Sequence, residues 1–240
     1  MNAKGVAGRA VLIAGATSAS GLAATEVLRA AGARVVAVGR DAAKLAELRE
    51  ALGTDASSLV SEPAGAVRTE VCDLTDEAAV GALAERIHET DGPLDGVLNL
   101  VGGWRGGGGL AGQTDADYRF LEGSLTALRH VSRAFDADLR ASESARLAVV
   151  SSTAVARPLA GGANYAAVKA ATEAWTRAVA QGFAKDARDS GKPLAAASVI
   201  FRVKSLDGLE EALAQRFADL WLSDASDIND TIVELTDPSL

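Results

Sequence analysis

The stretch AVLIAGATSASGL, residues 10–22, decides the fold of this chain. It opens with a short apolar run, continues into a turn of small residues between Gly15 and Gly21, and enters a helical pattern at Leu22. Glycine lets a phosphate approach the main chain, and the start of a helix offers unpaired N–H groups. The stretch therefore predicts a strand–turn–helix unit suited to a phosphate, although an ordinary tight turn uses the same small residues. Three hydroxyl groups are further candidate donors: those of Thr17, Ser18 and Ser20.

The remaining sequence repeats this alternation of short apolar runs and helical patterns. Strands are expected over residues 10–14, 34–38, 67–72, 94–101, 146–151, 194–203 and 231–235. Helices are expected over residues 22–31, 42–52, 77–89, 115–139, 164–186 and 209–222, and a surface loop over residues 54–66. Strands that alternate with helices predict an α/β fold, a single Rossmann-type doubly wound parallel sheet of about seven strands with helices on both faces. No linker or internal repeat divides the pattern, so residues 1–240 are expected to form one NAD(P)-binding domain.

Composition excludes several classes of protein. The formal net charge is −8 and no cluster of Lys or Arg occurs, which argues against a nucleic-acid or anionic-membrane partner. Cys72 is the single cysteine and there are two histidines, so no metal site of the usual ligand types and no internal disulfide is expected. This cysteine usage fits the cytoplasm. No apolar run is long enough for a membrane span, which needs about 18 residues.

The end of the second strand favours a phosphorylated cofactor. In NAD-binding folds an acidic residue commonly stands there and holds the ribose hydroxyls. Here Gly39 occupies that place and Arg40 follows, and a guanidinium matches a 2′-phosphate in charge and geometry. NADP(H) is therefore preferred, with NAD(H) as the alternative. Asp73, at the end of the third strand, is placed to reach an adenine edge, or equally to cap the turn that follows it.

Three residues form a candidate catalytic set. Tyr165 and Lys169 are four residues apart and share one face of a predicted helix. A nearby ammonium lowers the pKa of a phenol, which would let Tyr165 exchange a proton near neutral pH. Ser152 ends a strand thirteen residues earlier and could orient a substrate oxygen. Taken singly, the Tyr–Lys pair is a common surface arrangement and the serine an ordinary turn residue.

At this point the chain resembles the short-chain dehydrogenase/reductase family over roughly residues 8–235. Residues 14–21 correspond to the family's glycine-rich turn and residues 99–102 to its Asn-Asn-Ala-Gly element, while Ser152 matches the catalytic serine and residues 165–169 its Tyr-x-x-x-Lys motif. The pattern and the resemblance together give these cofactor-binding candidates: Gly15, Thr17, Ser18, Ser20, Gly21, Leu22, Arg40, Asp73, Leu74, Asn99, Val101, Gly102, Tyr165 and Lys169.

The resemblance implies a mechanism and an assembly. Hydride would pass from the reduced nicotinamide to a small ketone or aldehyde, or return in alcohol oxidation. Tyr165 would exchange the proton, Lys169 would bind the nicotinamide ribose and lower the Tyr165 pKa, and Ser152 would bind the reacting oxygen. Family members usually form homodimers or homotetramers. The expected substrate pocket involves Trp104, residues 153–163 with Thr153, and residues 202–206 with Arg202.

Departures from the family pattern keep alternatives open. Ala19 replaces a glycine, Ser124 stands where the family often has a catalytic Asn, and the Pro-Gly element is missing near residues 203–204, so the substrate-covering segment is short. A family-fold protein without redox turnover, either a cofactor sensor or a dehydratase or cyclase, is one alternative. The glycine-rich stretch 102–109, either a flexible or a functional loop, resembles that of quinonoid dihydropteridine reductases, with Trp104 as a stacking platform. Arg40 and Ser152 argue against that reductase.

Overall fold

The computed structural model describes residues 5–53 and 65–236. Most of the loop expected over residues 54–66 lies outside these ranges. The strands are β1 (Ala10–Ala14), β2 (Arg34–Gly39), β3 (Val67–Val71), β4 (Gly96–Asn99), β5 (Arg146–Ser152), β6 (Ala197–Val203) and β7 (Thr231–Leu235). The α-helices are α1 (Ala19–Ala30), α2 (Ala42–Ala51), α3 (Glu77–Thr90), α4 (Asp115–Ala134), α5 (Asp136–Ala141), α6 (Ala163–Ser190), α7 (Glu210–Asp219) and α8 (Ala225–Ile228). Three short 3₁₀ helices follow the same order: η1 (Thr153–Val155), η2 (Ala160–Gly162) and η3 (Leu220–Leu222).

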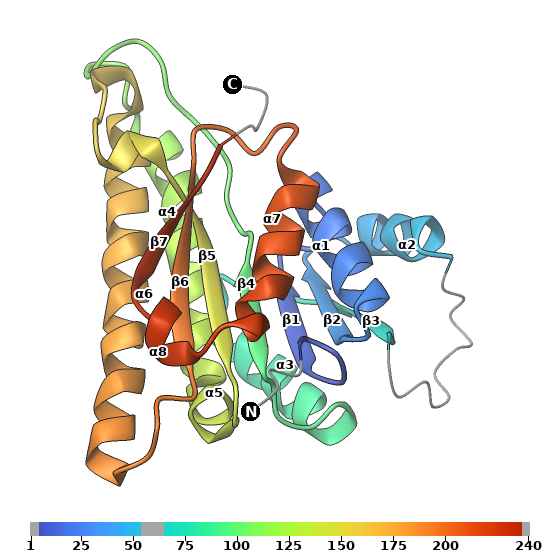
Figure 1. Cartoon of the computed structure of the whole chain (residues 1–240). Coiled ribbons are helices and arrows are strands. Elements are labelled where there is room, and N and C mark those ends of the chain that lie inside the picture. The colour runs from blue at the N-terminus through green and yellow to red at the C-terminus, as the bar shows by residue number, and fades with distance from the viewer. Residues whose placement is uncertain (1–4, 54–64, 237–240) are drawn as a thin grey trace.

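The strands form one parallel sheet in the order β3-β2-β1-β4-β5-β6-β7. The chain moves outward from β1 in one direction and then from β4 in the other, so the order reverses between β1 and β4 (Figure 1). Ligands of open α/β sheets bind outside the carboxyl ends of the strands at such a reversal. The predicted seven-stranded, doubly wound parallel sheet is confirmed.

Two apolar layers enclose the sheet. One contains Leu28 of α1 and Phe217 of α7, and the other contains Leu83 of α3, Leu128 of α4 and Phe183 of α6. Figure 1 shows α1 and α7 beside each other on one side of the strands, while the long α6 runs along the other. Every residue of β1 and β4 is buried, as expected for central parallel strands covered on both faces.

The predicted helix over residues 115–139 is wrong as one piece, because the chain breaks at Phe135. The Phe135 ring is fully buried, and the Phe135 backbone leaves helical geometry with φ −108° and ψ 12°. The new helix α5 brings the carboxylate of Asp138 to the backbone N–H of Leu94, which it accepts at 3.0 Å. The strand β4 is also shorter than the predicted run of residues 94–101, since it begins at Gly96 and ends at Asn99.

The end of the sheet opposite the carboxyl edge is closed by a buried arginine. Arg146, the first residue of β5, is 2% exposed and donates hydrogen bonds to four backbone carbonyls. They belong to Ala145, Ala195, Leu220 and Ser223. Burial lowers the pKa of Arg146 to about 10, the largest cause being desolvation. The guanidinium thus joins the start of β5 to the segments before β6 and after α7.

None of the helices in the described ranges is long and apolar enough to cross a bilayer. Within residues 5–53 and 65–236, no group of three or more His, Cys, Asp or Glu side chains is arranged to hold a metal ion.

Replacing Arg146 with Met should lower the free energy of unfolding by about 3 kcal/mol, because buried carbonyls lose their donor. Urea unfolding followed by circular dichroism measures the change. Arg216→Met on the exposed side of α7 is the matched control and should change stability by less than about 0.5 kcal/mol. Equal stability of the two variants would contradict the assigned role of Arg146.

Candidate active site

Two adjoining cavities lie at the carboxyl edge of the sheet, where the strand order reverses. The first has a volume of about 460 Å³ and the second about 1040 Å³. They share four lining residues: Ser18, Leu100, Val101 and Gly102. The shared residues come from the turn after β1 and from the segment after β4, so the two cavities form one groove across the switch point.

The turn after β1 needs glycine at two positions for different reasons. Gly15 has φ +85°, and a Cβ there would lie 3.0 Å from the backbone after β4, at the carbonyl carbon of Leu100 and the nitrogen of Val101. A Cβ on Gly21 would lie 2.3 Å from the carbonyl oxygen of Ala16. Gly15 therefore lets the turn lie against the segment that follows β4. Gly21 lets the first turn of α1 pack against Ala16 of the same turn.

Other residues of the turn divide between the two cavities. Thr17 lines the first cavity, Ser20 lines the second, and Ser18 lines both while its hydroxyl accepts the N–H of Gly21 at 3.1 Å. Leu22 lines neither cavity and packs against the core. Ala19, which replaces a glycine of the family pattern, is the first residue of α1 and does not have a positive φ. Its methyl group is therefore accommodated in the turn.

The first cavity carries positive charge beside β2. Arg40 and Lys44 line it together with Asp73 and Leu74 from the segment after β3. Asp73 Oδ1 accepts the backbone N–H and the hydroxyl of Thr75 at 2.9 and 2.7 Å. These bonds, with a smaller contribution from Arg40, lower the Asp73 pKa. Asp73 is thus both a turn-capping residue and a wall of the cavity.

The second cavity brings together the candidate catalytic set. Ser152, Tyr165 and Lys169 line it, with Asn99 and Trp104. Lys169 Nζ donates to the Val150 carbonyl at 2.8 Å and lies 5.8 Å from the centroid of the Tyr165 ring.

Burial shifts the two titrating side chains in opposite senses. It raises the pKa of the Tyr165 phenol, while a hydrogen bond with Ser152 acts against that rise. It lowers the pKa of the Lys169 ammonium to about 8, and the nearby Glu173 carboxylate opposes this drop. The Tyr165 pKa was expected to be lowered, which is wrong for this structure: the net shift is upward, because desolvation of the phenol outweighs the hydrogen bond with Ser152.

Two features of the groove suit a dinucleotide: an unpaired acceptor on Asn99 and the glycine turn after β1. Asn99 lines the second cavity, and its Oδ1 is buried with no hydrogen-bond partner among the described residues, so an acceptor is left unpaired beside the cavity. Gly15 packs the turn directly against the backbone after β4, and the turn leads into the N-terminus of α1, a kind of site that suits a phosphate. Phosphates would be held by this turn, and a nicotinamide ribose by Asn99 and Lys169.

Comparison with known sequences decides the family. The sequence model described as short chain dehydrogenase matches residues 9–187, well over half of the chain. The chain belongs to the short-chain dehydrogenase family.

Relatives within the family are distant. The chain is 28% identical over 178 residues to a 2,3-dihydro-2,3-dihydroxybenzoate dehydrogenase of Bacillus subtilis, covering 74% of this chain and 65% of that protein. The chain thus spans slightly less than two thirds of this curated relative. Among solved structures, a short-chain type dehydrogenase/reductase from Mycobacterium ulcerans aligns with TM-score 0.79 at 20% identity, covering 96% of this chain and 89% of that one. A metagenomic short-chain oxidoreductase in complex with NADP aligns with TM-score 0.79 at 23% identity, covering 97% and 99%.

Two expected site residues of this family member lie elsewhere. Ser124 lines the first cavity and not the second, and its hydroxyl donates to the Leu121 carbonyl of its own helix at 2.7 Å. Arg202 was expected in the substrate pocket, which is wrong: its guanidinium is turned to Glu173 and does not line the cavity. Thr153 and Trp104 do line it. Gly21 and Leu22 were also expected at the cofactor, but neither lines a cavity: Gly21 packs against Ala16 and Leu22 against the core.

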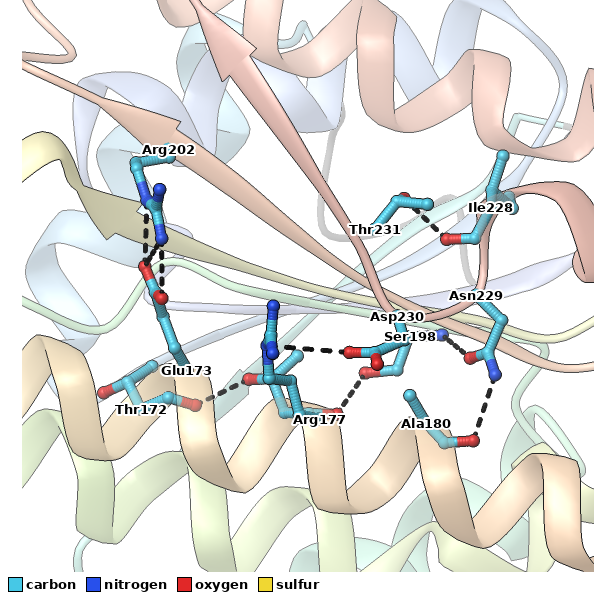
Figure 2. A network of polar contacts seen from close by, with 11 residues as sticks. Thr172, Glu173, Arg177, Ala180, Ser198, Arg202, Ile228, Asn229, Asp230 and Thr231 are labelled. Carbon is cyan, nitrogen blue, oxygen red and sulfur yellow. Dashed lines mark hydrogen bonds and ion pairs between the residues drawn. The ribbon is translucent and has the colours of Figure 1, made fainter. Parts of the chain in front are cut away.

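A buried carboxylate holds helix α6, which carries Tyr165 and Lys169, against the sheet. Glu173 lies one turn after Lys169 in α6 and is 7% exposed. It accepts the Ser151 hydroxyl at 2.7 Å and a fork of three hydrogen bonds from Arg202, the closest at 2.8 Å. Figure 2 shows the two side chains of this fork meeting between helix and sheet. Ser151 and Arg202 face each other in the β5–β6 register, so one carboxylate fixes both strand ends to the helix that carries Tyr165.

The glycine-rich segment after β4 is a hydrogen-bonded loop. Gln113 Nε2 donates to the carbonyls of Gly107 and Gly161 at 3.1 and 3.0 Å, and Gln113 Oε1 accepts the N–H of Asn164 at 3.1 Å. Gly107 N also donates to the Gly161 carbonyl at 2.7 Å. The loop is thus attached to Asn164, the residue that precedes Tyr165. Of the two predictions for residues 102–109, a flexible loop or a functional loop, this attachment favours the second.

Sequence reasoning missed several residues of the groove and its support. Lys44 was not singled out, because a lysine in an exposed helix carries no local signal. Glu173 carried a signal, since it lies four residues after Lys169 on the same helix face. Arg157, Leu159 and Lys204 fell inside the expected wall segments but were not named individually.

Glu173→Gln should move the pKa of Lys169 below the wild-type value of about 8, because the variant removes the negative charge that favours the ammonium. NMR of lysine side chains labelled with ¹³C at Cε follows this titration. Glu234→Gln is the matched control: Glu234 also contacts Arg202, at 3.5 Å, but its side chain is 56% exposed on β7. An unchanged Lys169 pKa in Glu173→Gln would show that the carboxylate has no electrostatic effect on the site.

Proposed function

We propose that this protein is an NADP(H)-dependent oxidoreductase that reduces a small ketone or aldehyde, or oxidises the corresponding alcohol. The observation that carries the proposal is that Ser152, Tyr165 and Lys169 line the same cavity. Asn99 lines it too, and its buried side-chain oxygen has no hydrogen-bond donor among the described residues. Membership of the short-chain dehydrogenase family supports the same reading.

Each of the three residues has a defined part in reduction. The cofactor supplies hydride to the carbonyl carbon. Tyr165 gives the phenolic proton to the carbonyl oxygen, and its raised pKa keeps that proton in place at neutral pH. Ser152, hydrogen-bonded with Tyr165, orients the same oxygen.

Lys169 supports the proton donor through its charge. It is an ammonium below pH 8, given its pKa of about 8, and lies 5.8 Å from the Tyr165 ring. Its positive charge stabilises the phenolate that remains after proton transfer.

Tyr165→Phe should lower kcat/KM for NADPH-dependent reduction by about 100-fold or more, because the proton donor is removed while the ring stays. The measurement is carbonyl-dependent loss of NADPH absorbance over a panel of small ketones and aldehydes. Tyr118→Phe, a half-exposed position in α4, is the control and should retain full activity.

Two results would overturn the proposal. One is full activity of Tyr165→Phe with every accepted substrate, since the phenol would then transfer no proton. The other is a wild-type protein that binds NADPH tightly but does not oxidise it when any carbonyl compound of the panel is added. That result would favour a cofactor-sensing or non-redox role.

The preference for NADP(H) is supported by charge and space beside β2. Arg40 and Lys44 line the first cavity, and both are available to a 2′-phosphate. At Gly39, where NAD-binding folds commonly carry an acid, a Cβ would lie only 2.8 Å from Thr17 Cγ2. An acidic side chain there would have to displace Thr17.

Arg40→Ala should weaken NADPH binding by about 10- to 100-fold, the range expected for charged hydrogen bonds to the 2′-phosphate. NADH binding should change by less than about threefold, because NADH lacks that phosphate. Calorimetric titration of both cofactors checks this. Equal losses for the two cofactors would assign Arg40 to the general shape of the groove, and tighter NADH binding by the wild type would reverse the preference.

A further inference from the structure

The second cavity has a charge bias that the catalytic set does not explain. Among the described residues that line it, none is aspartate or glutamate, although the whole chain has a net charge of −8. Three lining residues are basic: Arg157, Lys169 and Lys204. Lys169 is committed to the Val150 carbonyl and to the catalytic set, which leaves two cations without an assigned task.

Arg157 is free to bind a ligand. It follows η1 on the segment between Ser152 and Tyr165, and it is exposed. No hydrogen bond or ion pair joins its guanidinium to another described residue. By contrast, Arg105, which lines neither cavity, is engaged, because its guanidinium lies 4.0 Å from the centroid of the Phe120 ring. An unpaired guanidinium at the mouth of a site without acidic residues is suited to an anion.

The cavity that Arg157 lines also contains exposed apolar side chains. Trp104 and Leu159 line the same cavity and are 61% and 72% exposed, far more than is usual for such large side chains. Leu206 adds a third apolar contact from the segment after β6. A flat, apolar body would cover this surface while a charged end reaches Arg157.

We propose that the substrate is a carbonyl compound with an apolar, preferably aromatic, body and an anionic group, such as a carboxylate, that binds Arg157. This inference rests on the proposed reductase function and specifies the substrate class of that site. Arg157 lines only the cavity that holds Tyr165 and Ser152, whereas Arg40 and Lys44, which suit a 2′-phosphate, line the other. Lys204 lines the second cavity together with Ser18 and Ser20 of the turn after β1. The anion that Lys204 binds could therefore be a phosphate of the cofactor instead of the substrate.

A matched pair of ketones tests the proposal: 4-acetylbenzoate and its uncharged methyl ester. The wild type should reduce the acid with kcat/KM about tenfold higher than the ester, as expected for one partly exposed charged hydrogen bond. Arg157→Ala should abolish this preference without changing the KM for NADPH. Arg157→Lys should retain part of the preference, and Arg157→Glu should reverse it.

Control variants separate Arg157 from other sources of positive charge. Arg216→Ala removes one exposed cation from α7, outside both cavities, and should keep the full preference. Lys204→Ala distinguishes the anion sources: a raised KM for NADPH assigns Lys204 to cofactor phosphate, and a reduced preference for the acid assigns it to the substrate beside Arg157.

Binding is measured in parallel by calorimetry on protein saturated with NADP⁺, which cannot reduce either ketone. Turnover of both ketones without preference, or a preference that survives in Arg157→Ala, would overturn the anionic-substrate inference and leave the reductase function intact. Absence of turnover with tighter, Arg157-dependent binding of the acid would count against the reductase function while supporting the anion site. Equal binding of acid and ester to the wild type would overturn the anion site whatever the turnover.

Discussion

One polar stripe along helix α6 fixes the geometry on which the site depends. Lys169, Glu173, Thr176 and Ala180 lie on one face of this helix, at the spacing of successive turns. Lys169 bonds to β5, Glu173 to β5 and β6, and the carbonyls of Thr176 and Ala180 accept Ser198 Oγ and Asn229 Nδ2. Figure 2 shows Glu173 facing Arg202 of the sheet and the carbonyl of Ala180 facing Asn229 in the segment before β7.

This stripe replaces part of the apolar packing expected between a helix and a sheet. Buried polar groups are costly unless they are paired, so each bond tolerates little sliding of α6 along the strands. Tyr165 is one turn ahead of Lys169 on the same helix, and Ser152 directly follows Ser151 on the strand. The position of the phenol relative to the serine is therefore set in part by the contacts of Glu173, which lie outside the cavity.

Sequence alone predicted the order of the elements, the parallel sheet and the grouping of Ser152, Tyr165 and Lys169, because alternating patterns and short motifs are local properties. It did not predict the break at Phe135, which depends on a ring buried by distant residues and on Asp138 reaching Leu94. It misjudged Arg202, because the partner that turns this side chain away, Glu173, is remote in sequence. The sense of the Tyr165 pKa shift was also inaccessible, since desolvation depends on the whole enclosure of the phenol.

The loop after β4 bears on how this site could be redesigned. Gly107, Gly108 and Gly109 all have positive φ, and a Cβ on Gly106 would lie 2.5 Å from the Gly161 carbonyl oxygen. Random substitutions across this segment would thus mostly place a side chain on a strained backbone or against a neighbouring carbonyl. A focused library at Trp104 and Leu159 would instead change the lining of the second cavity. It would preserve the hydrogen bonds by which Gln113 joins the glycine-rich loop to the start of α6.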